Sequence, residues 1–414
     1  MMNEKQTAAA EAVERGESIF LTGPGGTGKS FTINEIYTKS SKKVALTALT
    51  GCAALLIHPQ AKTLHSWAGI GLGKDPLPKM TAIVRRSRKA MIRWISTEVL
   101  VIDEVSMMTP ELFETLDEVG RKIRNDPRPF GGIQLVLSGD FYQLPPIQET
   151  VQFAFESPLW KKLNLITHEL TEIVRQKDPV FQTILNEARV GSVSKESMRT
   201  LRKRLGIDYK KEEIQPTMLF TRRGEVDHVN RSHLMKLTTP KRIFSASTVY
   251  PSNTDMKKFD KEQIDRLDYN SSYSRELTLA VGAQVMLIMN KQELGLVNGS
   301  RGVVVGFTTE GLPTVKFLNR TLDIDYNTWS FTDTPGILRK QIPLILAYAI
   351  TIHKAQGSTL DCALIDVGDR TFEYGQAYVA LSRLKGLENL YIHDLSKDAF
   401  RAHPKVKDFY ASAL

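Results

Sequence analysis

The sequence predicts an α/β protein whose two lobes are each built on a parallel sheet. Within the first 170 residues, four apolar runs are each followed by a turn containing glycine or serine and then by a helical pattern, which is typical of parallel strands joined by crossover helices. These runs cover residues 18–22, 43–46, Val99–Asp103 and 133–138. A second alternating region starts near Thr171 and resumes from about Gln341 to the C-terminus, so a second lobe is expected.

Two segments interrupt this alternation. Between residues 63 and 97 the chain contains GIGLGKDPLPK and then the basic run 85–93, which predicts a small insertion that ends just before the strand at Val99. From 277 to 331, short β runs separated by Asn-Gly, Gly and Asn-Arg turns predict a small β-barrel inserted into the second lobe. The residues before it are expected to form a strand at Thr217–Phe220, a helix at 222–237 and an irregular connection at 247–274.

The composition is that of a globular protein with several domains. The 414 residues are 42% hydrophobic and 24% charged, and a single core stops growing at roughly 250–300 residues. The 55 Lys and Arg residues against 46 Asp and Glu give a net charge of +9, which fits a polyanionic partner and equally a basic protein without one. Cys52 and Cys362 lack metal-ligand spacing, and neither a signal peptide nor a run of ~20 apolar residues is evident. We therefore expect a soluble intracellular protein with no targeting segment and no membrane partner.

A phosphate-binding loop is the strongest local motif. The pattern G-x-x-x-x-G-K-S starts at Gly23, directly after a predicted strand, and opens a helix, which is the context that distinguishes such a loop from a chance glycine-rich turn. Its backbone N–H groups would surround phosphates at the positive end of the helix, while Lys29 neutralises the β- and γ-phosphates and Ser30 ligates Mg²⁺. ATP and Mg²⁺ are therefore the predicted cofactors. The predicted cofactor-binding residues in this loop are Gly23, Gly25, Gly26, Thr27, Gly28, Lys29 and Ser30.

Two carboxylates follow the apolar strand that starts at Val99. Asp103 and Glu104 come at its carboxyl end, where an open α/β sheet binds its ligands. Asp103 suits a hold on Mg²⁺, directly or through another ligand, and Glu104 suits the base that orients and deprotonates the attacking water. Acidic pairs at strand ends are often only solvated caps, but a phosphate-binding loop upstream favours the catalytic interpretation.

Three further residues are candidates for coupling hydrolysis to movement. Gln143 follows the strand 133–138, and its neutral amide could sense the γ-phosphate, although a proline-stiffened turn with a surface glutamine fits the spacing equally. A motor also needs a cation from a second, mobile lobe so that hydrolysis requires lobe closure. Arg175 and Arg383 qualify by position, and the alternative for each is an ordinary surface arginine.

Several segments together resemble the petite-integration-frequency (Pif) helicases of superfamily 1, the class that moves 5′ to 3′. The resemblance runs from about Gln6 to Leu390. It rests on the phosphate-binding loop, VIDEVSMM, FGGIQLVLSGDFYQLPP, LTEIVRQKDPVF, LVNGSRGVVVGF, QIPLILAYAITIHKAQGSTLD and GQAYVALSRL. It implies two RecA-like lobes, of which the first carries a small wedge insertion and the second an SH3-like β-barrel. The implied domains are 1–62 with 98–170 (first lobe), 63–97 (wedge), 171–276 with 332–414 (second lobe) and 277–331 (barrel).

The resemblance also assigns roles to individual residues. It makes Gln6 the adenine reader, Gln143 the coupling residue, and Arg175 and Arg383 the arginine fingers. The implied DNA-binding residues are Thr50, Gly51, Thr63, His65, Ser66, His353, Lys354 and Gln356. Other interpretations stay open: His65 could pack on Trp67, Lys354 could be a solvated helix end, and Trp67 is expected in the core. Leu49 departs from the family, which usually has proline before the Thr-Gly pair.

The implied function is an ATP-driven helicase that acts, as a monomer, on single-stranded and forked duplex DNA. G-quadruplex DNA and RNA–DNA hybrids are left open as substrates, as is the choice among replication, repair and recombination. A kinase for a small molecule would need only the first lobe and would leave the second lobe, with Arg383, unexplained. A binding protein without motor activity would not need the complete hydrolysis set.

Overall fold

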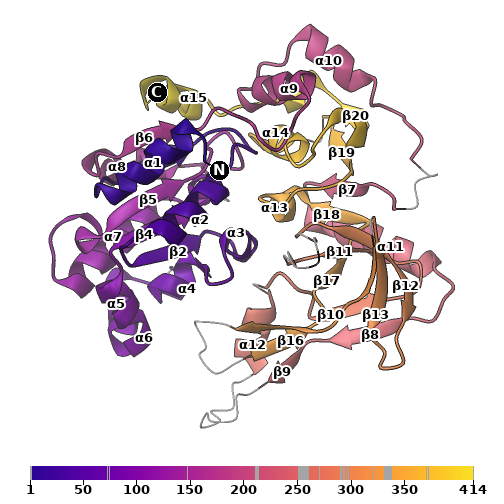
Figure 1. Cartoon of the computed structure of the whole chain (residues 1–414), viewed down its shortest axis with the longest axis horizontal. Helices are drawn as coiled ribbons and strands as arrows, with labels where there is room; N and C mark the ends of the chain where they lie inside the picture. The colour runs from indigo at the N-terminus through magenta and orange to yellow at the C-terminus, as the bar shows by residue number, and fades with distance from the viewer. Residues whose placement is uncertain are drawn as a thin grey trace. The chain divides into compact units, whose positions relative to one another are not determined.

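The computed structural model divides into two compact units. It describes residues 2–413 except 72, 74, 147, 210–213, 250–260, 270, 290, 292, 293, 295, 297, 319, 331–337, 370 and 372, and describes only the backbone at 52, 55, 262, 263, 266, 269 and 330. The first unit comprises Met1–Val193, Phe372–Ser382 and Phe400–Leu414, and the second comprises Ser194–Thr371 and Arg383–Ala399. Most of their helices and strands are labelled in Figure 1. Among the described residues, none of the helices has both the length and the apolar character needed to span a membrane.

The first unit is built on a six-stranded parallel sheet in the order β3-β2-β4-β5-β1-β6. The strands are β1 (Ile19–Thr22), β2 (Val44–Ala48), β3 (Lys62–Thr63), β4 (Val99–Asp103), β5 (Gln134–Ser138) and β6 (Ile166–Glu169). All four predicted strands of this lobe are confirmed, β4 with the predicted bounds and the other three with bounds shifted by one or two residues. The predicted parallel sheet of the first lobe is therefore confirmed.

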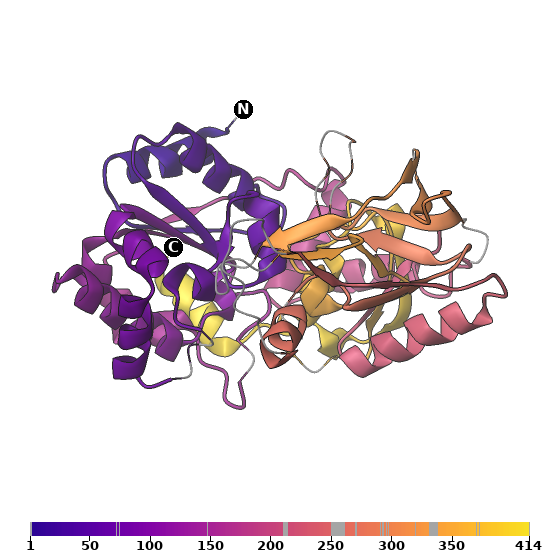
Figure 2. The same cartoon turned by 90° about the horizontal axis from the view of Figure 1, so that it is seen from below.

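Alternation along these strands divides the core of the first unit between the two faces of the sheet. Ile19, Leu21 and Val101 belong to one apolar cluster, whereas Phe20 and Leu100 belong to the other. Successive strand residues point to opposite faces, so a strand with helices on both sides is apolar throughout. Figure 2 shows helices on both sides of the indigo and purple strands. One face packs on α1 (Glu4–Glu14), α2 (Lys29–Lys39) and α3 (Gly51–Ile57), and the other on the helices from α4 to α8 and on α15 (Pro404–Ala413).

The predicted insertion is helical, with α4 (Leu64–Ala68), α5 (Leu77–Arg86) and α6 (Arg88–Ser96). Thr63, its expected first residue, instead ends the edge strand β3 and pairs beside Ala48. Trp67 is buried and packs on Trp94 with ring centroids 4.5 Å apart, which confirms that it belongs to the core. The helices α7 (Pro110–Arg124) and α8 (Pro158–Lys162) follow.

The second unit contains a four-stranded parallel sheet in the order β18-β7-β19-β20. Its strands are β7 (Thr217–Phe220), β18 (Ala349–Thr351), β19 (Ala363–Val367) and β20 (Leu390–Leu395), and its helices are α10 (Lys195–Arg202), α11 (Arg223–Lys236) and α13 (Ile352–Ala355). The predicted strand 217–220 and the helix expected at 222–237 are thus confirmed. This unit is therefore also an α/β structure.

Antiparallel strands form the rest of the second unit. A five-stranded sheet has the order β14-β13-β12-β11-β17, with β11 (Gln284–Leu287), β12 (Arg301–Phe307), β13 (Pro313–Phe317), β14 (Thr321–Asp323) and β17 (Leu344–Leu346). Two small sheets pair β8 (Arg242–Ser245) with β10 (Glu276–Leu279), and β9 (Ser247–Val249) with β16 (Leu338–Gln341), which also pairs with β15 (Asn327–Ser330). The expected irregular connection 247–274 was wrong in part, because it includes β9 and α12 (Lys261–Tyr269). Strand β17 also lies outside the range expected for the barrel.

The division into units does not follow the expected lobe boundaries. Three helices expected in the second lobe cluster with the first unit instead: α9 (Pro179–Arg189), α14 (Gln376–Leu381) and α15. The physical reason is a set of buried polar contacts that reach the strands of the first sheet. Tyr410 of α15, for example, forms a 2.7 Å hydrogen bond with Thr22 at the end of β1.

Candidate functional site

The phosphate-binding loop connects β1 to α2 and requires its glycines. Gly23, Gly26 and Gly28 all have positive φ, a conformation that side chains other than glycine rarely adopt. A Cβ on Gly23 would lie 2.1 Å from the Leu170 carbonyl oxygen, and one on Gly28 would lie 2.6 Å from Gln6 Nε2. The loop is therefore shaped by both its backbone and its close neighbours.

Lys29 is the first residue of α2, and Ser30 beside it is exposed. The Lys29 ammonium donates to the Gly23 carbonyl at 2.6 Å and to the Pro24 carbonyl at 3.1 Å. Desolvation lowers the pKa of Lys29, whereas the carboxylates of Asp140, Glu104 and Asp103 oppose this shift. A cation held inside the loop in this way suits a polyphosphate ligand.

Gln6 lies against the loop, where the resemblance had placed an adenine reader. It is buried, and its side chain both caps α1 through the Asn3 backbone N–H and donates from Nε2 to the Thr27 carbonyl at 3.2 Å. Thr27 itself is buried and donates to the Pro24 carbonyl at 2.9 Å. A hydrogen bond thus holds Gln6 against Thr27, about twenty positions further along the chain.

The acidic pair stands at the carboxyl end of β4, as expected. Burial and the neighbouring Glu104 carboxylate raise the pKa of Asp103 to about 7. Glu104 has φ 58° and ψ 40°, a left-handed conformation that is uncommon and costly for a residue with a side chain. Leu49 donates its backbone N–H to the Asp103 carbonyl at 3.3 Å, a bond that the family's usual proline could not make.

Gln143 is buried, so the alternative of a surface glutamine at this position is wrong. Its backbone N–H donates to the Asp140 carbonyl at 2.9 Å, which forms a tight turn after β5. Arg175 is held beside the phosphate-binding loop: its backbone N–H donates to the Gly26 carbonyl at 3.2 Å, and its Nη1 donates to the Ser382 carbonyl at 3.0 Å. The first unit therefore brings Gln6, Lys29, Asp103, Glu104, Gln143 and Arg175 around one end of its sheet.

Arg383 belongs to the second unit. It is almost completely buried, and its Nη1 donates to the Ser358 carbonyl at 3.4 Å. The alternative of an exposed surface arginine is therefore wrong for this residue.

The residues present fit ATP with Mg²⁺. The glycine conformations leave backbone N–H groups at the start of α2, beside an ammonium group and the exposed hydroxyl of Ser30. Among the described residues there is no group of three or more His, Cys, Asp or Glu side chains that could hold a metal ion alone. Mg²⁺ in phosphate sites is usually bound by one or two protein oxygens together with the phosphates, which matches Ser30 and Asp103.

The candidate DNA contacts of the first unit are mostly at helix starts. Thr50 caps α3 by accepting the Ala53 N–H at 3.2 Å, and Thr63 caps α4 by accepting the Ser66 N–H at 3.3 Å. Both threonines, together with Gly51 and His65, are half-buried. The Ser66 hydroxyl is buried without a hydrogen-bond partner among the described residues. Trp67, on which His65 was suggested to pack, has its ring against that of Trp94.

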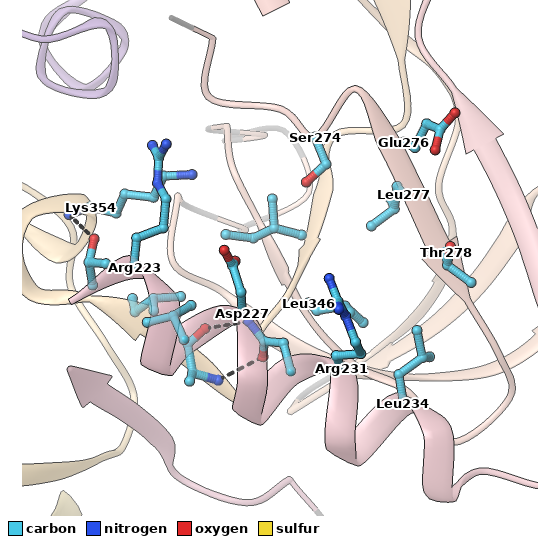
Figure 3. A pocket seen from close by; sticks show the side chains of 16 residues that line it. Arg223, Asp227, Arg231, Leu234, Ser274, Glu276, Leu277, Thr278, Leu346 and Lys354 are labelled. Atoms are coloured by element: carbon cyan, nitrogen blue, oxygen red, sulfur yellow. Dashed lines mark hydrogen bonds between the residues drawn. The ribbon is translucent and has the colours of Figure 1, made fainter. Parts of the chain in front are cut away.

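The candidates of the second unit lie on α13, after β18. Burial lowers the pKa of the half-buried His353, Lys354 is exposed, and Gln356 is buried. Lys354 lines a pocket of about 410 Å³, and α11 contributes Arg223 and Arg231 to the same pocket. Figure 3 shows these three basic side chains together with Asp227 and Glu276. The two arginines were not among the DNA-binding residues predicted from the sequence, although the cations at helical spacing on 222–237 could have indicated them.

Known proteins similar to this chain identify its family. A model for "PIF1-like helicase" matches residues 1–197, and a model for "DNA helicase Pif1, 2B domain" matches residues 262–307. The crystal structure of Pif1 helicase from Candida albicans is 35% identical and covers 100% of both chains with a TM-score of 0.83. The chain belongs to the PIF1-like helicase family.

Other PIF1-like relatives also match nearly the whole of this chain. The human "ATP-dependent DNA helicase PIF1" is 41% identical over 99% of this chain, and this chain spans 64% of the human protein. A structure described as two coordinating Pif1 helicases unwinding forked double-stranded DNA is 29% identical, with a TM-score of 0.71 over 100% of this chain and 97% of the other. The family assignment thus rests on both sequence and fold.

Proposed function

We propose that this chain is an ATP-dependent DNA helicase that moves 5′ to 3′ on single-stranded DNA and unwinds forked duplexes. The observation that carries the proposal is the complete hydrolysis set around the phosphate-binding loop of a PIF1-like chain. Lys29, Asp103 and Glu104 combine an ammonium group and two carboxylates at the end of one sheet. The human and fungal relatives described above are named as Pif1 helicases.

Each residue near the loop has a role in this proposal. Gln6 reads the adenine, Lys29 and the loop amides hold the phosphates, and Ser30 with Asp103 would hold Mg²⁺. When bound, Mg²⁺ neutralises phosphate charge and orients the transferred group. Glu104 takes a proton from the attacking water, and its left-handed backbone conformation ends the extended run of β4. Gln143 senses the state of the γ-phosphate.

The two arginines are proposed to couple ATP hydrolysis to movement. Arg175 is anchored beside the loop, whereas Arg383 belongs to the other compact unit. An arginine supplied by a second unit makes hydrolysis depend on closure between the units, which is how a motor couples chemistry to movement. We propose that both units are RecA-like lobes in this sense.

The grip on DNA is proposed to come from both units. The first contributes Thr50, Gly51, Thr63, His65 and Ser66, and the second contributes His353, Lys354 and Gln356. Helix α11 adds Arg223 and Arg231 from the pocket of Figure 3. Phosphate contacts of this kind bind strands of any sequence and weaken with salt.

The insertions are proposed to act at the fork. The helices α5 and α6 expose Ile83, Ile92 and Ile95 together with Arg85 and Arg88, which suits an apolar wedge flanked by phosphate contacts. The five-stranded antiparallel sheet of the second unit is proposed to be the SH3-like module. A single chain carries the whole residue set, so we propose that a monomer suffices for hydrolysis.

The test uses two matched duplexes, one with a 5′ and one with a 3′ single-stranded tail. We expect unwinding of the first and little or none of the second, together with ATP turnover that rises when single-stranded DNA is added. The same assay with increasing protein concentration tests whether a monomer suffices, and G-quadruplex or RNA–DNA substrates can replace the duplex. Preference for the 3′ tail would overturn the direction, and turnover indifferent to DNA would favour a small-molecule kinase.

A further inference from the structure

A buried polar cluster lies beside the phosphate-binding loop in the first unit. This Asp140 cluster comprises Asp140, Tyr142, Arg189, Tyr378 and Tyr410. The Asp140 carboxylate is fully buried and accepts hydrogen bonds from Arg189 Nε at 2.9 Å and Arg189 Nη2 at 3.0 Å. The Tyr378 hydroxyl donates to the same carboxylate at 3.2 Å. Four segments far apart in the sequence thus meet at one carboxylate.

The Arg189 guanidinium is stabilised in its charged form. Burial by itself lowers the pKa of Arg189. The Asp140 carboxylate raises this pKa, and the net shift is upward. The guanidinium carbon also lies 4.7 Å from the ring centre of Tyr142 and 5.3 Å from that of Tyr410, within the range of cation–π attraction. A buried ion pair seldom stabilises a fold more than apolar residues of the same volume would. Its presence here therefore calls for a reason besides stability.

Tyr378 provides that reason, because its hydroxyl also contacts the phosphate-binding loop. It accepts the backbone N–H of Gly25 at 2.7 Å while it donates to Asp140. A phenol has one hydrogen to donate, so the bond to Asp140 leaves its oxygen free to accept from Gly25. The ion pair thus fixes the hydroxyl, and the hydroxyl fixes the direction of one loop amide.

The same helix also holds Arg175. The carbonyl of Tyr378 accepts the Ser382 N–H at 2.9 Å. The carbonyl of Ser382 in turn accepts from Arg175 Nη1 at 3.0 Å and from Gln176 Nε2 at 3.3 Å. Hydrogen bonds of the Tyr378 hydroxyl to Asp140 and of the Tyr378 carbonyl to Ser382 therefore link the ion pair, by way of α14, to a candidate arginine finger.

We propose that Asp140, Arg189 and Tyr378 are positioning residues for ATP hydrolysis, because together they fix the Gly25 amide and the carbonyl that holds Arg175. The inference rests on the proposed ATPase function. Misplacing a group by about 1 Å can slow a reaction by roughly 10²-fold. Affinity for ATP depends on Gln6, Lys29 and the remaining loop amides, which keep their own contacts. Loss of the cluster should therefore lower kcat far more than it raises KM.

The second unit offers a matched control. Tyr273 donates its hydroxyl to Asp268 at 2.6 Å, and Arg339 donates to the same carboxylate from Nε at 2.9 Å and Nη2 at 2.7 Å. Tyr273 is buried like Tyr378, and it belongs to the second unit together with Asp268 and Arg339. Tyr378→Phe and Tyr273→Phe each remove one hydroxyl from a buried, arginine-paired aspartate.

The experiment measures DNA-stimulated kcat, KM for ATP and the thermal midpoint of the full chain and of both variants. We expect Tyr378→Phe to lower kcat about 10- to 100-fold with KM within about 3-fold of the unmodified chain, and Tyr273→Phe to leave both within about 2-fold. Equal kcat losses in the two variants, or a KM that rises as much as kcat falls, would overturn the proposal. So would an unchanged kcat in Tyr378→Phe.

If Tyr378→Phe does not fold, Arg189→Lys tests the same positioning role. It retains the positive charge beside Asp140 but cannot donate two parallel hydrogen bonds, so we expect a kcat loss of about 3- to 10-fold at unchanged KM. An unchanged kcat in that variant contradicts the inference. A chain that hydrolyses no ATP with DNA present refutes the proposed function instead, since the inference concerns only variants of an active enzyme.

Discussion

The parallel sheets of the two units place polar residues after the same ends of their strands but bury them differently. In the first unit, Asp103, Asp140 and Gln143 are at most 6% exposed. In the second unit, His353 is half-buried and Lys354 is exposed. Buried groups have fixed positions and act strongly on a reacting phosphate, whereas exposed cations can bind and release a DNA strand repeatedly. Under the proposed function, one architecture would thus serve ATP hydrolysis in one unit and reversible binding of DNA in the other.

Two residues of the second unit, Gln356 and Arg383, depart from this comparison because they are buried, and removal of Arg383 should have the largest effect. Arg383 belongs to the second unit but is buried like the residues of the first. We expect Arg383→Ala to lower DNA-stimulated turnover by roughly 10³-fold, which is the typical contribution of an arginine finger. Steady-state ATPase rates at saturating DNA provide the measurement.

Arg301→Ala is the matched control for this variant. Arg301 is equally buried in the second unit, and its Nη1 also donates to a backbone carbonyl, that of Gln215. Its loss should reduce the thermal midpoint without a comparable loss of turnover. If both variants lose turnover in proportion to stability, Arg383 is structural rather than catalytic.

Glu104 should give the next largest effect. Glu104→Gln keeps the shape of the side chain but removes the base, so turnover should fall at least about 100-fold while binding of Mg–ATP persists. Glu98→Gln is its control at the other end of the same strand, where the Glu98 carboxylate accepts the Lys43 N–H at 2.7 Å. Nucleotide binding and single-turnover rates separate the two steps. Near-normal turnover in Glu104→Gln would remove Glu104 from the role of base.

Replacement of Lys354 should have the smallest effect, and it should change the affinity for DNA rather than ATP turnover. Lys354→Ala should weaken binding of single-stranded DNA severalfold and lower the slope of log affinity against log salt by about 0.7, since one phosphate contact is lost. Turnover at saturating DNA should stay within about 2-fold. Lys407→Ala, at an exposed position of α15, is the control. An unchanged salt slope in Lys354→Ala would indicate that Lys354 is only the solvated end of a helix.

Local signals explain what the sequence could predict. The strands of the first sheet are continuous apolar runs, and the residues after β1 and β4 follow a spacing that phosphate chemistry dictates. Tyr378 and Arg189 carry no such signal, because their role depends on contacts with Gly25 and Asp140, and two of these pairs are 49 and 238 residues apart. Strand β17 was missed for the same reason: its pairing with β11 across 57 or more residues has no local pattern.

The return of α15 to the first unit has a consequence for synthesis of the chain. Tyr410 accepts the Phe141 N–H at 3.1 Å across 269 residues, and Phe409 packs on Phe20 and Phe141. At about 5–20 residues per second, roughly 13 to 54 s separate translation of these partners. During that interval the nascent first unit lacks the helix that packs on these aromatic residues in the folded chain. Chaperone demand on the ribosome should therefore extend until the end of α15 has emerged.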